Sequence, residues 1–305
     1  MMPPHLTTSG GLNMELKGWS SGILGVLIFS GTLPATRVAV ATFDPIFFTL
    51  ARAALAGVIA AVILFLMRQS RPARSDYNAL LVVALGVVVG FPLLVALALR
   101  HVSAAHATVF VGLLPLMTVI FSVLRGGENP RKIFWLFSVI GSLVVAGFAL
   151  GQGIQVSLFD DLIMLVAVIM CGMGYAEGAR LAKHLGGWQV ICWALVIALP
   201  LMLPLSLWTL PDNLQQATWP AWLSLGYVTL FSMLIGFFFW YQGLALGGVA
   251  SVSQLQLLQP FFGFGLAALL LGEHVSTNMI TSAVAVALCV AGAKRFAKGP
   301  DTFRT

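Results

Sequence analysis

The chain has 305 residues, of which 59% are hydrophobic and only 9% are charged, whereas roughly a quarter of the residues in soluble proteins are charged. This composition excludes a soluble protein and indicates an integral membrane protein. The formal net charge is +6, but the 16 Lys and Arg residues are scattered between long apolar segments, so they form no continuous basic face for a nucleic acid.

Ten apolar segments are long enough to cross a membrane as helices, since a span needs about 20 residues. They cover residues 19–41, 46–67, 77–99, 104–124, 133–153, 161–182, 189–208, 220–246, 250–271 and 276–293. The polar segment 1–18 lacks a basic start and a cleavage site, so we expect the first span to be retained. The sequence therefore predicts an all-α integral membrane protein with ten spans.

The distribution of Lys and Arg predicts the orientation in the membrane, because these residues concentrate in cytoplasmic loops. With the N-terminus in the cytoplasm, 13 of the 16 fall on that side, including the basic tail 294–305, and only Arg100 falls in an outer loop. Arg37 and Arg52 lie within spans. We expect the plasma membrane (the inner membrane of a two-membrane cell), with both termini cytoplasmic.

The chain contains an internal repeat, with residues 19–153 forming the first unit and residues 160–293 the second. Arg37 matches Arg180 at an offset of 143, and Ala98-Leu99 matches Ala245-Leu246 at an offset of 147. Pro115 and Glu128 match Pro260 and Glu273 at an offset of 145. Because each unit has five spans, an odd number, the second unit is inverted relative to the first. Secondary transporters share this plan, with a substrate site near the midplane between the repeats.

Several short motifs give the chain a resemblance to a known superfamily. They are FDPIFFTLARAALAG at 43–57, the small-residue segments VSAAHA and VASVS, the prolines within spans 4 and 9, and the Gly-Glu pairs at 127–128 and 272–273. With these, the chain resembles the drug/metabolite transporter superfamily, and within it the EamA-type exporters. The resemblance extends from Trp19 to Ala293. The stretch 29–57 also resembles aromatic amino-acid exporters of this superfamily.

The resemblance implies ten helices around a central cavity lined by spans 1, 3, 4, 6, 8 and 9, with export of amino acids as the activity. The chain departs from a symmetric plan at Arg52, because the offset of 143 places Leu195 at the equivalent position. Arg52 is therefore not assigned a symmetric role.

Span 9 carries polar residues where span 4 is mostly apolar. Ser253, Gln256 and Gln259 fall on one helical stripe, since successive helical residues are about 100° apart. The glutamines could clasp neighbouring helices through interhelical hydrogen bonds. For the stripe as a whole we favour a cavity wall, whose amide groups would face a zwitterion.

Span 8 contains the aromatic segment FFFWYQ at 237–242. Trp240 lies on a glycine-rich face, which either permits close helix contact or leaves room for a ligand. We predict that Trp240 and Gln242 of this span, together with Tyr175 of span 6, contact the substrate. Packing in the core or against lipid is the alternative.

Ionisable residues inside spans are functional candidates because burying a charge in lipid is costly. Arg37 and Arg52 lie near the outer face and could reach it with their long side chains. Glu177 could pair with Arg180, either as a structural ion pair or as an inner gate or proton-linked carboxylate. His106 could titrate near neutral pH or simply lie at the interface.

The remaining polar positions have simpler interpretations. Glu128 and Glu273 are interpreted as polar groups at helix starts. The three cysteines, Cys171, Cys192 and Cys289, all lie in apolar segments, so we expect buried thiols and neither a disulfide framework nor a metal site.

The sequence also narrows the activity. There is no Walker loop for ATP, no HExxH, no GxSxG and no pair of intramembrane aspartates, which argues against an enzyme. We expect a secondary transporter without a cofactor that exports amino acids and has the lipid bilayer as its other partner. Export of another small metabolite or drug-like solute is the alternative, although a cationic drug would need more carboxylates in the cavity. An intramembrane enzyme and a receptor that transports nothing are more remote alternatives.

Overall fold

The computed structural model describes residues 7–125, 127–151, 157–212, 214–263, 265 and 277–298, and every regular element within them is a helix. Nine helical stretches of these residues are long and apolar enough to cross a membrane. They are Asn13–Val40, Pro45–Leu66, Arg74–Ala98, His106–Leu124, Lys132–Leu150, Leu158–Leu185, Gly187–Trp208, Trp219–Gly247 and Thr277–Phe296. The tenth expected span, 250–271, is described only over residues 250–263 and 265. The all-α membrane fold is confirmed.

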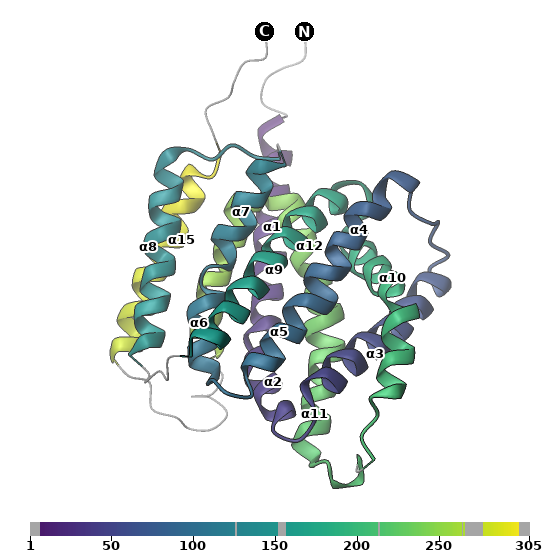
Figure 1. Cartoon of the computed structure of the whole chain (residues 1–305). Coiled ribbons are helices and arrows are strands. Elements are labelled where there is room, and N and C mark those ends of the chain that lie inside the picture. The colour runs from purple at the N-terminus through teal and green to yellow at the C-terminus, as the bar shows by residue number, and fades with distance from the viewer. Residues whose placement is uncertain are drawn as a thin grey trace.

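Several spans consist of more than one helical element (Figure 1). The elements are α1 (Thr7–Ser30), α2 (Thr32–Val40), α3 (Pro45–Leu66), η1 (Arg74–Asp76), α4 (Tyr77–Val83), η2 (Ala84–Gly90), α5 (Phe91–Ala98), α6 (Ala104–Val111), α7 (Leu114–Leu124), α8 (Lys132–Leu150), α9 (Leu158–Leu185), α10 (Gly187–Trp208), η3 (Leu214–Gln216), α11 (Trp219–Tyr227), η4 (Val228–Ile235), α12 (Gly236–Gly247), α13 (Val249–Ser253), η5 (Gln254–Leu258) and α15 (Thr277–Phe296).

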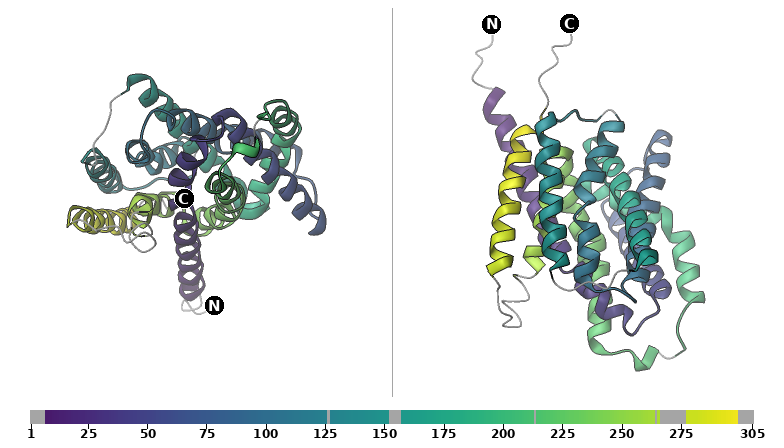
Figure 2. Two further views of the ribbon diagram at one scale, coloured as in Figure 1. Left: turned by 90° about the horizontal axis from the view of Figure 1, so that it is seen from below. Right: turned by 60° about the vertical axis from the view of Figure 1, so that its left-hand side comes forward.

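The packing of the spans follows the repeat. Helix α1 of the first repeat packs along α12 of the second, and α9 of the second packs along α4, η2 and α5 of the first. Helices α3 and α10 pack together, as do α8 and α15, so these spans each meet their own counterpart (Figure 2). The counterparts run in opposite directions, which is the inverted arrangement that five spans per repeat require.

Irregular helix geometry occurs at matched places in the two repeats. The π-helical segments η2 and η4 begin 144 residues apart, in spans 3 and 8. Span 4 is interrupted between α6 and α7, just before Pro115, and span 9 becomes a 3-10 helix at η5, just before Pro260. Proline has no backbone N–H to continue a helical ladder, which accounts for the position of both interruptions.

Glycines bring α1 and α12 into direct backbone contact. A Cβ atom added to Gly18 would lie 2.3 Å from the backbone nitrogen of Gly247, and one added to Gly243 would lie 2.7 Å from that of Gly22. Such distances leave no room for a side chain, and small residues are what allow membrane helices to approach this closely. The glycine-rich face of span 8 is therefore a helix contact and not a space for a ligand.

Helix α1 begins and α15 ends on the same side of the molecule (Figure 1), which is called the terminal side below. Helix α1 starts at Thr7, twelve residues before the apolar segment begins at Trp19. Contacts with the end of α15 hold this extension: Lys298 donates to Glu15 at 2.9 Å, and the Lys294 ammonium lies 3.9 Å from the centre of the Trp19 indole. The shared side agrees with an even number of spans.

Candidate functional site

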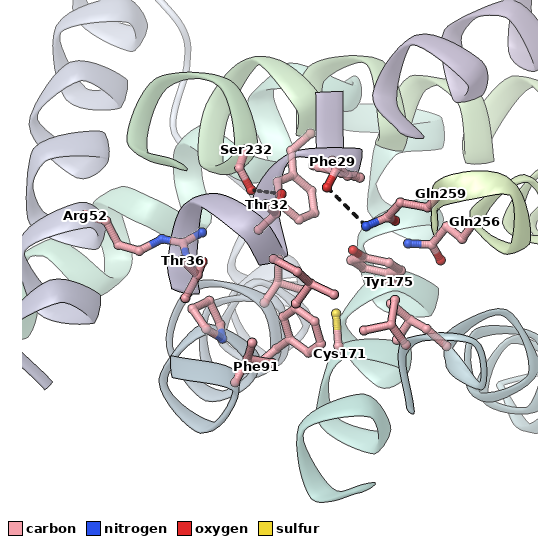
Figure 3. A pocket seen from close by; sticks show the side chains of 17 residues that line it. Phe29, Thr32, Thr36, Arg52, Phe91, Cys171, Tyr175, Ser232, Gln256 and Gln259 are labelled. Carbon is pink, nitrogen blue, oxygen red and sulfur yellow. Dashed lines mark hydrogen bonds between the residues drawn. The ribbon is translucent and has the colours of Figure 1, made fainter. Parts of the chain in front are cut away.

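A cavity lies between the two repeats, near the middle of α9 (Figure 3). It is lined by Phe29, Thr32, Leu33, Thr36, Arg52, Val87, Phe91, Pro92, Val95, Val111, Leu114, Cys171, Tyr175, Ser232, Phe237, Gln256 and Gln259. These residues come from spans 1, 3, 4, 6, 8 and 9, the six spans that the resemblance implies, and from span 2, which supplies Arg52. The wall is mostly apolar, with a few polar groups.

The cavity is contracted in this conformation. The volume open to water-sized molecules is about 40 Å³, enough for only a few waters, since each needs roughly 10–15 Å³ by this measure. A metabolite-sized solute would therefore fit only after the lining spans move apart. The structure thus shows a site that is too small for such a solute.

Two of the predicted glutamines lie on the cavity wall. Gln259 donates a 3.1 Å hydrogen bond to the backbone carbonyl of Phe29, joining span 9 to span 1. The buried Oε1 of Gln256 has no hydrogen-bond partner. Tyr175 also lines the cavity, and Thr32 and Ser232 share a hydrogen bond of 2.9 Å across spans 1 and 8. Gln259 thus both clasps a neighbouring helix and lines the cavity, and the side-chain oxygen of Gln256 remains a free hydrogen-bond acceptor.

Three other predicted substrate contacts lie outside the cavity lining. Trp240 is completely buried, with its ring centre 5.6 Å from that of Tyr175 and 6.2 Å from that of Phe29. Gln242 is exposed on α12, and Ser253 is buried with its hydroxyl 3.5 Å from the carbonyl of Ala250. The rotation of α12 that brings its glycines against α1 also turns Trp240 behind the cavity wall. Substrate contact by these three residues stays a prediction.

Arg52 is the charged residue of the cavity lining, and the sequence analysis did not assign it to the substrate site. Its side chain does not reach the outer face as expected but is buried, with 4% of the residue exposed, and points into the cavity. The first turns of α3 are buried on almost all sides, so a side chain at this position has no path to the surface. Its repeat counterpart Leu195 is a fully buried core residue. The signal in the sequence that could have identified Arg52 was the absence of an arginine at the equivalent position of the second repeat.

Glu177 lies two residues beyond Tyr175 on α9, toward the terminal side, and is 1% exposed. Its carboxylate accepts hydrogen bonds from Arg180, at 2.8 and 3.0 Å, and from the Nε of Arg125 at the end of α7. The predicted pair of Glu177 and Arg180 is thus part of a three-residue cluster that ties span 4 to span 6. Whether this cluster acts as a gate stays a prediction.

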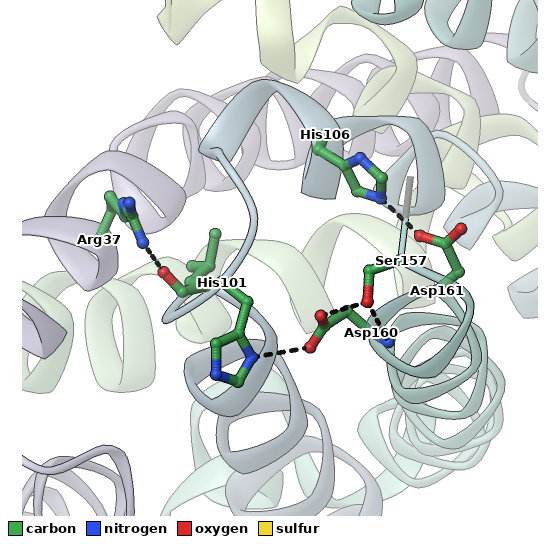
Figure 4. Close-up of polar contacts among 7 residues, drawn as sticks. Arg37, His101, His106, Ser157, Asp160 and Asp161 are labelled. Atoms are coloured by element: carbon green, nitrogen blue, oxygen red, sulfur yellow. Dashed lines mark hydrogen bonds and ion pairs between the residues drawn. The ribbon is translucent and has the colours of Figure 1, made fainter. Parts of the chain in front are cut away.

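Two histidines bind two aspartates on the opposite side (Figure 4). His106 Nε2 lies 2.6 Å from Asp161 Oδ1, and His101 Nδ1 lies 3.1 Å from Asp160 Oδ1. His106 is buried, whereas the side chain of His101 is 65% exposed. His106 thus lies at the start of span 4, as predicted, but packs against the start of span 6 instead of facing the interface. Spans 4 and 6 are therefore joined at both ends.

The other arginine within a span is exposed. Arg37 donates to the backbone carbonyl of Leu99 on the same side as the two histidines. Its long side chain thus reaches the surface near the end of its span, in contrast to that of Arg52.

The carboxylate of Glu128 lies at the start of α13, where it binds two backbone N–H groups. Burial raises the pKa of the Glu128 carboxyl above its ordinary value, and the two hydrogen bonds and the charge of Lys183 offset part of this shift. Glu128 is thus a polar group at a helix start, and the helix whose start it binds is α13. Glu273 lies outside the described residues. The three cysteines are free and buried, and no cluster of His, Cys, Asp and Glu within the described ranges is suited to a metal ion.

Comparisons with known proteins agree with this architecture. The sequence profile described as the EamA-like transporter family matches residues 16–150 and 158–293. The uncharacterized transporter YdeK of Bacillus subtilis (strain 168) is 60% identical over 287 residues, which cover 94% of this chain and 100% of YdeK. The pseudopaline exporter CntI of Pseudomonas aeruginosa (strain UCBPP-PA14) is 27% identical over 234 residues, covering 74% of this chain and 76% of CntI.

A solved crystal structure has the same fold, with a TM-score of 0.74 and 17% sequence identity over 92% of this chain and 97% of that chain. The profile matches the chain twice, once for each repeat, and so confirms the resemblance at the level of the superfamily. The finer resemblance to aromatic amino-acid exporters is not decided by these relatives. On its two matched repeats and its similarity to YdeK, the chain belongs to the EamA-like transporter family.

Proposed function

We propose that this transporter exports amino acids, including aromatic and other large apolar ones, by alternating access to the central cavity. The mixed character of the cavity wall carries this proposal. Phe29, Phe91 and Phe237 offer apolar ring surface, and Gln256 and Gln259 offer amides. Apolar contact supplies a modest, non-directional gain of about 25 cal/mol per Å², and a few placed polar groups fix orientation. Such a wall suits large apolar solutes that must also leave.

The ends of spans 4 and 6 are suited to act as gates. The cluster of Arg125, Glu177 and Arg180 closes the terminal side, and the pair of His106 and Asp161 closes the other. Because the closed cavity admits only a few waters, a solute enters when one of these contacts opens and leaves when the other does. Glu177 is then the inner gate residue, and His106 belongs to the outer gate.

The orientation and direction are part of the same proposal. The excess of Lys and Arg on the terminal side favours a cytoplasmic location for both termini in the plasma membrane. Outward transport is supported by the resemblance to exporters and by CntI, whose name describes an exporter. The partners are the solute and the bilayer, and no chemical conversion of the solute is expected.

A second candidate is the export of a small metabolite other than an amino acid. The observation that favours it is the similarity to the pseudopaline exporter, which covers about three quarters of both chains. The same cavity and gates would serve such a solute.

Reconstitution into liposomes tests both candidates. Vesicles loaded with labelled amino acids and small-metabolite competitors would be compared with protein-free vesicles, with and without a pH gradient. Protein-dependent efflux of phenylalanine, tryptophan and leucine, chemically unchanged, is the expected result. Efflux of none of these, together with transport of another metabolite, would replace the first candidate by the second.

A further inference from the structure

The charge of the cavity wall comes from a single residue. Among the seventeen lining residues, Arg52 is the one that is charged, and none is Asp or Glu. Its guanidinium reaches into the cavity from α3, opposite Gln256 and Gln259 (Figure 3). The carbon at its centre lies 5.9 Å from the centre of the Phe48 ring, a cation–π contact that does not neutralise the charge. The cavity therefore carries a net positive charge.

Arg52 has no counter-ion within the described part of the chain. None of the ion pairs there involves it, and its buried Nε has no hydrogen-bond partner. Other buried or half-buried charges differ in this respect: Glu177 binds two arginines, Asp160 binds His101, and Glu128 binds two backbone N–H groups. A buried charge without a partner is costly, so Arg52 is the exception that calls for a ligand.

The groups around Arg52 fit a carboxylate. A guanidinium carries five N–H donors in a planar fork that matches the two oxygens of a carboxylate. Thr36, which is 1% exposed and lines the same cavity, has a hydroxyl that also lacks a partner. It can donate a further hydrogen bond to an anionic oxygen. A positively charged amine would meet repulsion here, and a neutral amide would leave the charge uncompensated.

We propose that Arg52 is the site at which the transported solute is held by its carboxylate, with the apolar part of the solute lying over Phe29, Phe91 and Phe237. This inference rests on the proposed function and deepens it, because it states that the solute carries a carboxylate and gives the orientation of the solute in the cavity. It also gives a reason for the asymmetry of the repeat: one carboxylate needs one arginine, and the counterpart Leu195 can remain in the core.

A set of matched ligands tests the proposal on the wild-type protein. Phenylalanine, phenylalaninamide, 3-phenylpropionate and phenethylamine share a ring and differ in whether they carry a carboxylate. Binding would be measured by the shift in Tm of the purified transporter, and transport by competition in proteoliposomes. The two carboxylates should bind at least tenfold more tightly than the amide and the amine. Equal competition by phenylalanine and phenylalaninamide would overturn the proposal.

Substitutions locate the effect. Arg52→Gln should remove the preference for carboxylates, and Arg52→Lys should keep part of it, because the charge remains but the planar fork is lost. Arg100→Gln is the matched control, since Arg100 is an exposed arginine 3.7 Å from Asp44, and it should leave the ranking of ligands unchanged. If Arg52→Gln yields no folded protein, the ligand set on wild type and on Arg52→Lys still decides.

The outcomes separate this proposal from the proposed function. Transport of amino acids with a ranking that Arg52→Gln leaves unchanged would refute the role of Arg52 and leave amino-acid export standing. No transport of any amino acid, with a Tm shift by 3-phenylpropionate that depends on Arg52, would support the carboxylate site and refute amino-acid export.

Discussion

Glu128, in the loop after span 4, accepts a 2.6 Å hydrogen bond from the backbone nitrogen of Val249, the first residue of α13. Its second oxygen accepts another of the same length from Ala250. Gly248, just before them, has a φ of +86°, a conformation that favours glycine. A carboxylate of the first repeat thus caps the helix start of span 9 in the second, the span that carries the two glutamines of the cavity wall.

We expect Glu128→Ala to destabilise the protein by about 1–2 kcal/mol, because it removes the partners of two backbone N–H groups at a helix start. The measurement is Tm in detergent together with the yield of monodisperse protein. Glu15→Ala is a useful control, since Glu15 forms a surface ion pair with Lys298. Equal losses in the two variants would contradict a special role for the Glu128 contact.

The stability of the protein should also depend on pH through Glu128. Burial raises the pKa of this carboxyl, so the folded state holds the proton more tightly than the unfolded state. The stabilisation that is linked to protonation of this carboxyl is therefore fully present below the ordinary carboxyl pKa and is lost as the pH rises through the raised value, while the two backbone hydrogen bonds remain. The Tm of wild type should fall more steeply than that of Glu128→Gln across this window. Parallel Tm profiles would show that protonation of Glu128 is not linked to folding.

Opening of the terminal side should depend on Glu177. Replacing it with glutamine removes the negative charge that holds Arg125 and Arg180, and a loss of about 1–2 kcal/mol would raise the open population roughly five- to thirtyfold. Cys171 in the cavity wall reports opening, in a protein whose two other cysteines are replaced by alanine. A membrane-impermeant maleimide added from the terminal side should label Cys171 correspondingly faster in Glu177→Gln.

The matched control for this measurement is Asp161→Asn, which weakens the contact with His106 on the opposite side. It should not speed labelling from the terminal side. If both variants, or neither, labelled faster from the terminal side, the cluster around Glu177 would not be the gate on its side.

The sequence predicted the parts of this fold that depend on length and repetition. Spans follow from apolar segments of about 20 residues, and the offset between Pro115 and Pro260 predicted the repeat, although the helix interruptions beside these prolines were not predicted. The lining by six particular spans came from the resemblance and not from the residues themselves, and the structure agrees with it.

The rotation of each helix could not be predicted in the same way. All faces of a membrane span are apolar, so hydrophobic periodicity does not show which face meets the cavity. Trp240 and Phe237 are three residues apart on α12, yet only Phe237 lines the cavity. The long side chain of Arg52 could equally reach outward or inward, and only its burial by neighbouring helices shows that it points inward.

The orientation in the membrane is open to a direct test. The loop asymmetry of Lys and Arg predicts that Arg71 and Arg131 face the cytoplasm and Arg100 faces outward. In a protein without its native cysteines, Arg71→Cys should react with an impermeant maleimide only after the cells are permeabilised. Arg100→Cys, the control on the opposite side, should react in intact cells. The reverse pattern would invert the topology and the direction assigned to each gate.

The last prediction separates Trp240 from Phe237. Trp240 is fully buried against Tyr175 and Phe29, so Trp240→Ala should cost about 3–5 kcal/mol and lower Tm, yield and transport of all substrates together. Phe237 borders the cavity, so Phe237→Ala should also change selectivity. Competition by phenylalanine and tryptophan should weaken by roughly tenfold relative to small amino acids, the factor that 1.4 kcal/mol of lost apolar contact gives. Because both variants lose packing, the ranking of competitors per folded protein is the measurement that discriminates. A Trp240→Ala protein of normal Tm that had lost its preference for aromatic substrates would place the Trp240 indole against the substrate, and the closed packing around it would then have to open during transport.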